Sequence, residues 1–309
     1  MKIVTITPNP AIDLTVKLEK LIPGEVHRAE FSTAHAGGKG INVSSRLAAY
    51  GMTSAASGFL GHDNAGFFER HFQENNIADA FLRIPGESRT NIKIVDALGT
   101  TDINLKGMTV KADDVENLLA KTESLFAEGG GLAVLSGSLP PGCPPDFYRR
   151  LTKKLKASGA AVLLDADGAA LKNALSGETL PDCIKPNVKE FSEWAGESLA
   201  TLAGILKTAR KLLERGLRLI VVSMGGEGAV FVNQHEAIHV EGTVVRLAST
   251  VGAGDAMMAG IAAAWDQDLE SAARLATAFS TAWLEKNGEG LHFHEKVEKS
   301  ITNVRAAKL

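Results

Sequence analysis

The chain has 309 residues, of which 45% are hydrophobic and 22% charged, the balance of a soluble globular protein with a substantial core. Its formal net charge is −3 and its basic residues are scattered among acidic ones, so nucleic acid is not an expected partner. No apolar run reaches the ~18 residues of a membrane span, and the apolar stretch before Pro8 is too short for a signal peptide, so we expect a cytoplasmic protein without membrane association.

The first fifty residues predict three strands and a helix. Residues 2–7 form a β-branched run typical of a buried strand, and residues 12–18 alternate like a half-exposed strand. A second polar-faced strand is predicted over residues 26–33. The glycine cluster at 37–40 then opens a helix over residues 41–50.

Strands and helices alternate along most of the remaining chain. Further strands are predicted over residues 54–59, 132–136, 161–165, 183–186 and 218–223, and helices over 65–75, 145–158, 189–195 and 202–215. Alternation of this kind is typical of a doubly wound α/β fold, with a mostly parallel sheet and helices on both faces. We therefore expect one domain that covers residues 1–309.

The alternation is interrupted between Thr90 and Lys106. Two short strands are predicted there, over residues 91–96 and 102–106, joined by a turn around Gly99. Together with the two polar-faced strands near the N-terminus they would form a small separate sheet. Such a sheet, built from about 11–35 and 88–107, would suit a lid over a site.

The clearest chemical signal is the run Gly252-Ala253-Gly254-Asp255 before an apolar helix of small residues. The first amides of a helix are unpaired and carry partial positive charge, and glycine lets an anion approach the backbone closely. This loop therefore predicts a phosphate cradle. An acid inside the cradle would repel a bound phosphate, so Asp255 is better explained as a base that takes a proton from an attacking hydroxyl. The alternative is a tight turn in which Asp255 is only a first-turn acid.

Two other glycine-rich motifs fail on spacing. A dinucleotide-binding fingerprint requires glycine three places after Gly254, where Met257 stands, which weakens the hypothesis of a dinucleotide-dependent oxidoreductase. A Walker-type loop would require Ser or Thr after Lys39 and a glycine five places before Gly38, but Gly40 and Thr33 occupy those positions.

The chain resembles the ribokinase family of carbohydrate kinases, in its PfkB branch, because it contains the Gly252–Asp255 loop together with four further motifs. The resemblance covers nearly the whole chain and rests on five ordered motifs: Asn9-Pro10-Ala11-Ile12-Asp13, Gly37-Gly38-Lys39-Gly40-Ile41-Asn42-Val43, Ser136-Gly137-Ser138-Leu139-Pro140-Pro141-Gly142, Lys185-Pro186-Asn187-Val188-Lys189-Glu190 and Gly252-Ala253-Gly254-Asp255. Ser249 replaces an aspartate common in the wider family, which fits the phosphofructokinase branch.

The resemblance implies an ATP-dependent sugar-phosphate kinase with Mg²⁺. It is strongest to bacterial kinases that convert fructose 1-phosphate to fructose 1,6-bisphosphate, and kinases of tagatose 6-phosphate are the near alternative. Asp255 would be the general base, and the amides of Gly252, Ala253, Gly254 and Asp255 would stabilise the transferring group. A catalytically silent sugar-phosphate sensor of the same fold is the alternative of a different class.

The resemblance also assigns binding residues. The sugar phosphate would contact Asp13, Gly38, Lys39, Asn42, Arg89 and Ser138, with Lys39 and Arg89 gripping its phosphate. The nucleotide would contact Asn187, Ser223, Gly225, Gly228 and Gly254.

Several of these assignments have plainer alternatives. Asn187 and Glu190 would organise Mg²⁺ through water, but they also fit a helix capping box, and both roles can coexist. The segment 223–228 equally fits a hairpin turn. The lid strands further imply a homodimer in which the two small sheets clasp.

Overall fold

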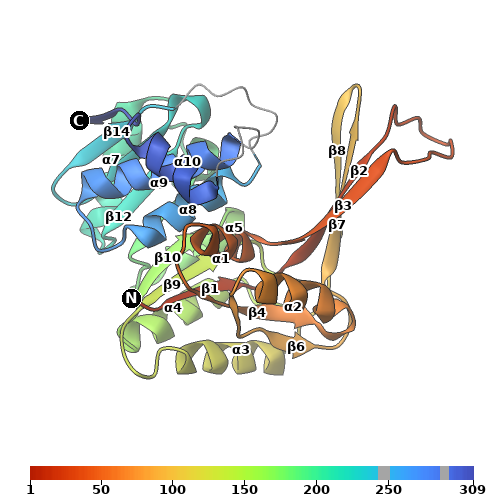
Figure 1. Cartoon of the computed structure of the whole chain (residues 1–309). Coiled ribbons are helices and arrows are strands. Elements are labelled where there is room, and N and C mark those ends of the chain that lie inside the picture. The colour runs from red at the N-terminus through yellow and green to blue at the C-terminus, as the bar shows by residue number, and fades with distance from the viewer. Residues whose placement is uncertain (243–250, 286–291) are drawn as a thin grey trace.

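The computed structural model describes residues 1–242, 251–285 and 292–309, and its largest element is an 11-stranded sheet (Figure 1). The strand order is β15-β14-β13-β12-β11-β10-β9-β1-β4-β5, with β6 paired to β4. All pairs from β5 through β12 are parallel, and β13 to β15 continue the sheet as antiparallel strands. The predicted mostly parallel, doubly wound sheet is thereby confirmed.

The bounds of the elements are as follows. The strands of the large sheet are β1 (Ile3–Thr7), β4 (Ala55–Gly61), β5 (Ala78–Asp79), β6 (Leu82–Ile84), β9 (Leu132–Ser136), β10 (Ala161–Asp165), β11 (Cys183–Ile184), β12 (Leu219–Ser223), β13 (Ala229–Val232), β14 (Ala237–Val240) and β15 (Ala306–Lys308). The α-helices are α1 (Lys39–Ala49), α2 (Ala65–Glu74), α3 (Ala112–Ser124), α4 (Phe147–Ala157), α5 (Gly168–Ala174), α6 (Val188–Ala195), α7 (Leu202–Glu214), α8 (Ala253–Ala263), α9 (Leu269–Leu284) and α10 (Phe293–Ile301).

Both faces of the large sheet are buried beneath helices. Alternate residues of a strand point to opposite faces, and in β9 Leu132 and Val134 join the core under α1, α8, α9 and α10, whereas Ala133 and Leu135 join the core under α3 to α7. Helices on both faces explain why the first four residues of β9 are all apolar. This burial holds the carboxyl ends of the parallel strands along one edge, where the site residues gather.

The small sheet has the order β3-β2-β7-β8 and projects from the main body as an arm (Figure 1). Its strands are β2 (Ala11–Lys17), β3 (Phe31–Gly37), β7 (Arg89–Asp96) and β8 (Gly99–Asn104). At its root Ala11 pairs with both Gly37 and Arg89, so the three strands meet where β1 leaves the main sheet.

The second arm strand differs from its prediction. It was expected over residues 26–33 but runs from Phe31 to Gly37, and Val26 lies in the preceding connection with 97% of its surface exposed. Pairing with β2 determines this register, because Ala11 opposite Gly37 lets β3 run directly into α1. The sequence did not predict helices α3, α5, α9 and α10 or strands β5, β6 and β13 to β15.

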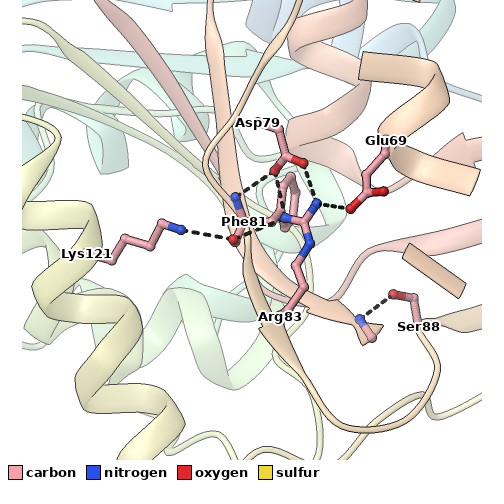
Figure 2. Close-up of polar contacts among 7 residues, drawn as sticks. Glu69, Asp79, Phe81, Arg83, Ser88 and Lys121 are labelled. Carbon is pink, nitrogen blue, oxygen red and sulfur yellow. Dashed lines mark hydrogen bonds and ion pairs between the residues drawn. The ribbon is translucent and has the colours of Figure 1, made fainter. Parts of the chain in front are cut away.

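A group of polar side chains braces the edge of the large sheet before the arm begins (Figure 2). Arg83 of β6 pairs with Asp79 of β5 and with Glu69 of α2, and it donates to the Phe81 carbonyl, which also accepts from Lys121 of α3. Gly61 N donates to Ser88 Oγ at 2.9 Å, one residue before β7 starts. These contacts fix the point from which Arg89 enters the arm.

Candidate active site

The glycine-rich loop forms the N-terminus of α8, as the sequence predicts. Gly252 has φ +83°, a left-handed conformation that favours glycine, and its carbonyl accepts the Ala256 amide at 3.0 Å. Helix geometry leaves the amides of residues 253–255 without partners inside the helix. Asp255 lies in this first turn with only 8% of its surface exposed. The loop therefore joins anion-binding amides to a buried carboxylate.

Asp255 has the electrostatics of a proton acceptor. Burial, followed by the negative charge of Asp165, raises the pKa of Asp255 to about 6. Three contacts lower this pKa. One is the hydrogen bond from Asn42 Nδ2 to Asp255 Oδ2 at 2.7 Å, and the other two are the positive charges of Lys39 and Lys185. A carboxylate with a raised pKa is a stronger base, and it remains ionised near neutral pH.

Two residues at this site, Asp165 and Lys185, were not assigned from the sequence. Asp165 ends β10 and is buried, and its two oxygens face Lys39 Nζ at 3.1 Å and Lys185 Nζ at 3.3 Å. Burial alone would raise the pKa of Asp165, but the two lysines hold it below its ordinary value. A Cβ at Gly254 would lie 3.3 Å from Lys185 Nζ, which places this ammonium beside the amide cradle.

A second set of predicted residues lies at the root of the arm. Asn91 Nδ2 donates to Asp13 Oδ1 at 2.9 Å, and a Cβ at Gly37 would lie 2.1 Å from Asp13 Oδ2, so a larger residue there would displace this carboxylate. Gly38, with φ +116°, caps α1 beside this carboxylate. Burial is the main cause that raises the pKa of Asp13.

A cavity of about 640 Å³ opens where β7 begins, at the root of the arm. It is lined by Arg89 and Ser138, as predicted for substrate residues, and also by Asn9 and Lys106. Arg89 Nη2 donates to the Asn9 carbonyl at 3.3 Å. Asn9 Oδ1 and Arg89 Nε are both buried without a hydrogen-bond partner in the described structure.

Lys39 and Arg89 have different acidic neighbours. Lys39 pairs with Asp165 and lies within electrostatic range of Asp255, whereas Arg89 lies within range of Asp13. The predicted substrate residues therefore divide into an arm-root group, with Asp13, Arg89 and Ser138, and a group around Asp255, with Lys39 and Asn42.

Three of the five predicted nucleotide residues line another cavity, of about 480 Å³. They are Asn187, Ser223 and Gly225, and Met224 and His239 lie beside them. Gly254, in the first turn of α8, does not line it, and neither does Gly228. The φ of Gly228 is +91°, and a Cβ would meet the Val240 carbonyl at 1.8 Å, so this glycine shapes the turn from β12 into antiparallel β13, as expected for a hairpin.

Asn187 and Glu190 form the predicted capping box of α6. Asn187 N donates to Glu190 Oε2, and Glu190 N donates to Asn187 Oδ1, both at 2.9 Å. These bonds leave Glu190 Oε1 available, and Glu190 lies near enough to Lys39 to affect its pKa. Mg²⁺ binds oxygen ligands and usually keeps several of its waters, so it needs few protein oxygens. Asn187 and Glu190 therefore fit a Mg²⁺ site in which water molecules lie between the protein and the metal.

The described residues contain no cluster of three or more His, Cys, Asp or Glu side chains able to hold a metal directly. No helix in the described ranges has the length and apolar character to cross a membrane. Ser249 and Thr250, at the start of the loop motif, lie outside the described residues.

The molecule combines an open α/β sheet and a projecting small sheet with a carboxylate in an anion-binding helix N-terminus. This combination is typical of a phosphotransferase that acts on a small molecule. The comparisons with known proteins give the family. The model of the pfkB family of carbohydrate kinases matches residues 4–295, and the chain belongs to this family. It is thus an ATP-dependent carbohydrate kinase.

The relatives cover nearly the full chain. The 1-phosphofructokinase of Xanthomonas campestris pv. campestris is 44% identical, over 92% of this chain and 92% of that protein. That of Rhodobacter capsulatus is 42% identical, over 94% and 93%. The phosphofructokinase-2 of Escherichia coli, solved in complex with fructose-6-phosphate, is 25% identical with a TM-score of 0.88 and 98% of each chain covered.

Proposed function

We propose that the protein transfers the γ-phosphoryl group of MgATP to the primary hydroxyl of fructose 1-phosphate, giving fructose 1,6-bisphosphate. The observation that carries the mechanism is Asp255, a buried carboxylate of raised pKa in the first turn of α8. Relatives named 1-phosphofructokinase, 33–44% identical to this chain, support the acceptor.

In this reaction Asp255 takes the proton of the acceptor hydroxyl as the hydroxyl oxygen attacks the γ-phosphorus, and the bond from that phosphorus to the bridging oxygen breaks with ADP as the leaving group. The amides of Ala253, Gly254 and Asp255 stabilise the negative charge on the transferring group. Lys39 and Lys185 lie beside the same loop, where their charges add to this stabilisation. Mg²⁺, held through water by Asn187 and Glu190, would neutralise charge on the nucleotide phosphates.

The acceptor would lie between Asp255 and the arm root. We assign Asp13 and Asn42 to the sugar hydroxyls, and Arg89 with Ser138 to the phosphate already on the sugar. This orientation places the free hydroxyl at one end and the phosphate at the other, as a sugar bisphosphate product requires. ATP would occupy the cavity lined by Asn187, Ser223 and Gly225.

An acceptor panel tests the proposal. We expect kcat/KM for fructose 1-phosphate to exceed that for tagatose 6-phosphate, fructose 6-phosphate and fructose by about tenfold or more, or about 1.4 kcal/mol of transition-state discrimination. ADP release at saturating MgATP measures it. If tagatose 6-phosphate leads, the mechanism stands and the acceptor is wrong. A sensor without catalysis would bind a sugar phosphate and release no ADP.

We also propose that the enzyme is a cytoplasmic homodimer joined through the arms. Ile103 of β8 is 44% exposed, and its register with Ile92 of β7, and through Ile92 with Leu14 of β2, gives one face of the small sheet an apolar row suited to a second copy. Light scattering at micromolar concentration should give twice the monomer mass, and Ile103→Asp should reduce it toward the monomer. A monomeric wild type would contradict the proposal.

A further inference from the structure

The loop that carries Asp255 is held from behind by α9. Trp283 Nε1 donates to the Val251 carbonyl at 2.8 Å, and Ser280 Oγ donates to the Ala253 carbonyl at 2.7 Å. The Trp283 ring also packs against Gly252, since a Cβ there would lie 2.8 Å from Nε1. The position of this indole therefore affects the position of the cradle.

Arg46 lies directly on the same indole. Its Cζ is 3.3 Å from the centroid of the Trp283 ring, the stacked contact typical of a planar guanidinium on an aromatic face. Arg46 Nε is buried and has no hydrogen-bond partner in the described part of the chain. Burial lowers the pKa of Arg46 to about 10, which still leaves it charged at neutral pH. Among the described residues, the guanidinium of Arg46 therefore has the face of the Trp283 ring as its packing partner.

The helix that carries Arg46 also touches Asp255 directly. Arg46 follows Asn42 by one turn of α1, so the two side chains lie on the same face of the helix. Asn42 donates to Asp255 itself, and Arg46 reaches the loop through Trp283. Contact at two points fixes both the carboxylate and the backbone amides against α1.

We propose that Arg46 and Trp283 are positioning residues for the phosphoryl-transfer loop: the stacked guanidinium holds the indole, and the indole holds residues 251–253 through its hydrogen bond and its packing on Gly252. Neither residue is proposed to touch substrate. Their contribution is the alignment of the loop amides with the transferring group, a requirement of the transition state more than of substrate binding.

The test is a double-mutant cycle. Arg46→Met removes the planar cation, and Trp283→Phe removes the donor to Val251 while it keeps an aromatic ring. We expect each change to lower kcat about tenfold, with KM for MgATP and for the acceptor changed less than twofold. Because both residues act through one contact, the double variant should lose little more than either single variant.

Arg218→Met is the matched control, because Arg218 stacks on Trp265 at 5.1 Å, at the amino end of β12 and away from the loop. We expect this control to keep kcat. Additive losses in the cycle, or an Arg46→Met variant with wild-type kcat and an unchanged melting temperature, would overturn the inference. So would a rise in KM for MgATP at constant kcat, which would make Arg46 a nucleotide ligand.

The inference rests on the proposed role of Asp255, yet the two fail separately. An active Asp255→Asn enzyme would remove the proposed base whatever Arg46 does. An inactive Asp255→Asn enzyme combined with a fully active Arg46→Met enzyme would remove only the positioning role.

Discussion

Asp255→Asn is expected to lower kcat by about a thousandfold, within the range of general base catalysis, with little change in KM for the phosphorylated sugar. The amide has nearly the same shape as the carboxylate and can still accept the hydrogen bond from Asn42, but it cannot take a proton. Steady-state ADP release measures kcat, and calorimetry measures acceptor affinity. Asp113→Asn, in the first turn of α3, is a control with the same change of charge.

The pH dependence of kcat should identify the same group. The pKa of Asp255 is about 6 and the ionised form is the base, so the rate should fall as pH decreases through about 6. Asn42→Ala removes a hydrogen bond that lowers this pKa, so the acid limb should move to higher pH. An Asp255→Asn enzyme with near wild-type turnover and the same acid limb would rule out the assigned base.

Asp165→Asn is expected to lower the free energy of unfolding by about 3–5 kcal/mol, the cost of removing one partner from a buried ion pair. Lys185 is only 5% exposed, and both Lys185 and Lys39 would lose their carboxylate. Urea unfolding monitored by circular dichroism gives the change. The pKa of Asp165 is lowered in the folded state, so its stabilisation should be present at neutral pH and lost as pH falls below about 4.

Asp182→Asn provides a matched control. Asp182 is also buried, but its single lysine partner, Lys156, keeps 33% of its side chain exposed and can return to water. We therefore expect a smaller loss of stability in this variant. A loss below about 1 kcal/mol in Asp165→Asn would show that water replaces the missing charge.

Removal of Asp165 should also move the acid limb of kcat to lower pH, because its charge raises the pKa of Asp255.

Local patterns in the sequence predicted much of the fold. Strands β9 and β10 have the predicted bounds, because a parallel strand buried on both faces is a continuous apolar run, closed here by Ser136 and by Asp165. The Gly252–Asp255 loop was found because its glycines and its acid are adjacent in the chain. The start of β3 was missed by five residues, because its register depends on pairing with Ala11 rather than on its own composition.

The missed site residues depend on contacts between distant segments. Asp165 and Lys185 come together because β10 and β11 are neighbours, with Leu164 opposite Ile184 one residue earlier. The signal was available, since Asp165 ends one predicted strand and Lys185 belongs to the next, predicted over residues 183–186. Arg46 and Trp283 gave no such signal, because their contact requires the packing of α1 and α9 around α8.

Ala11 pairs with both Gly37 and Arg89, and this register holds the root of the arm in place. Sequence changes at the tip of the arm and at its root should therefore have different effects. At the far end of the arm, insertions or substitutions in the connection 18–30 can alter the surface offered to another subunit and leave Asp13 in place. At the root, a shift of one residue would turn every side chain of the strand to the opposite face and carry Asp13 out of the site. Assembly can therefore diverge among descendants of this chain while the acceptor site is preserved.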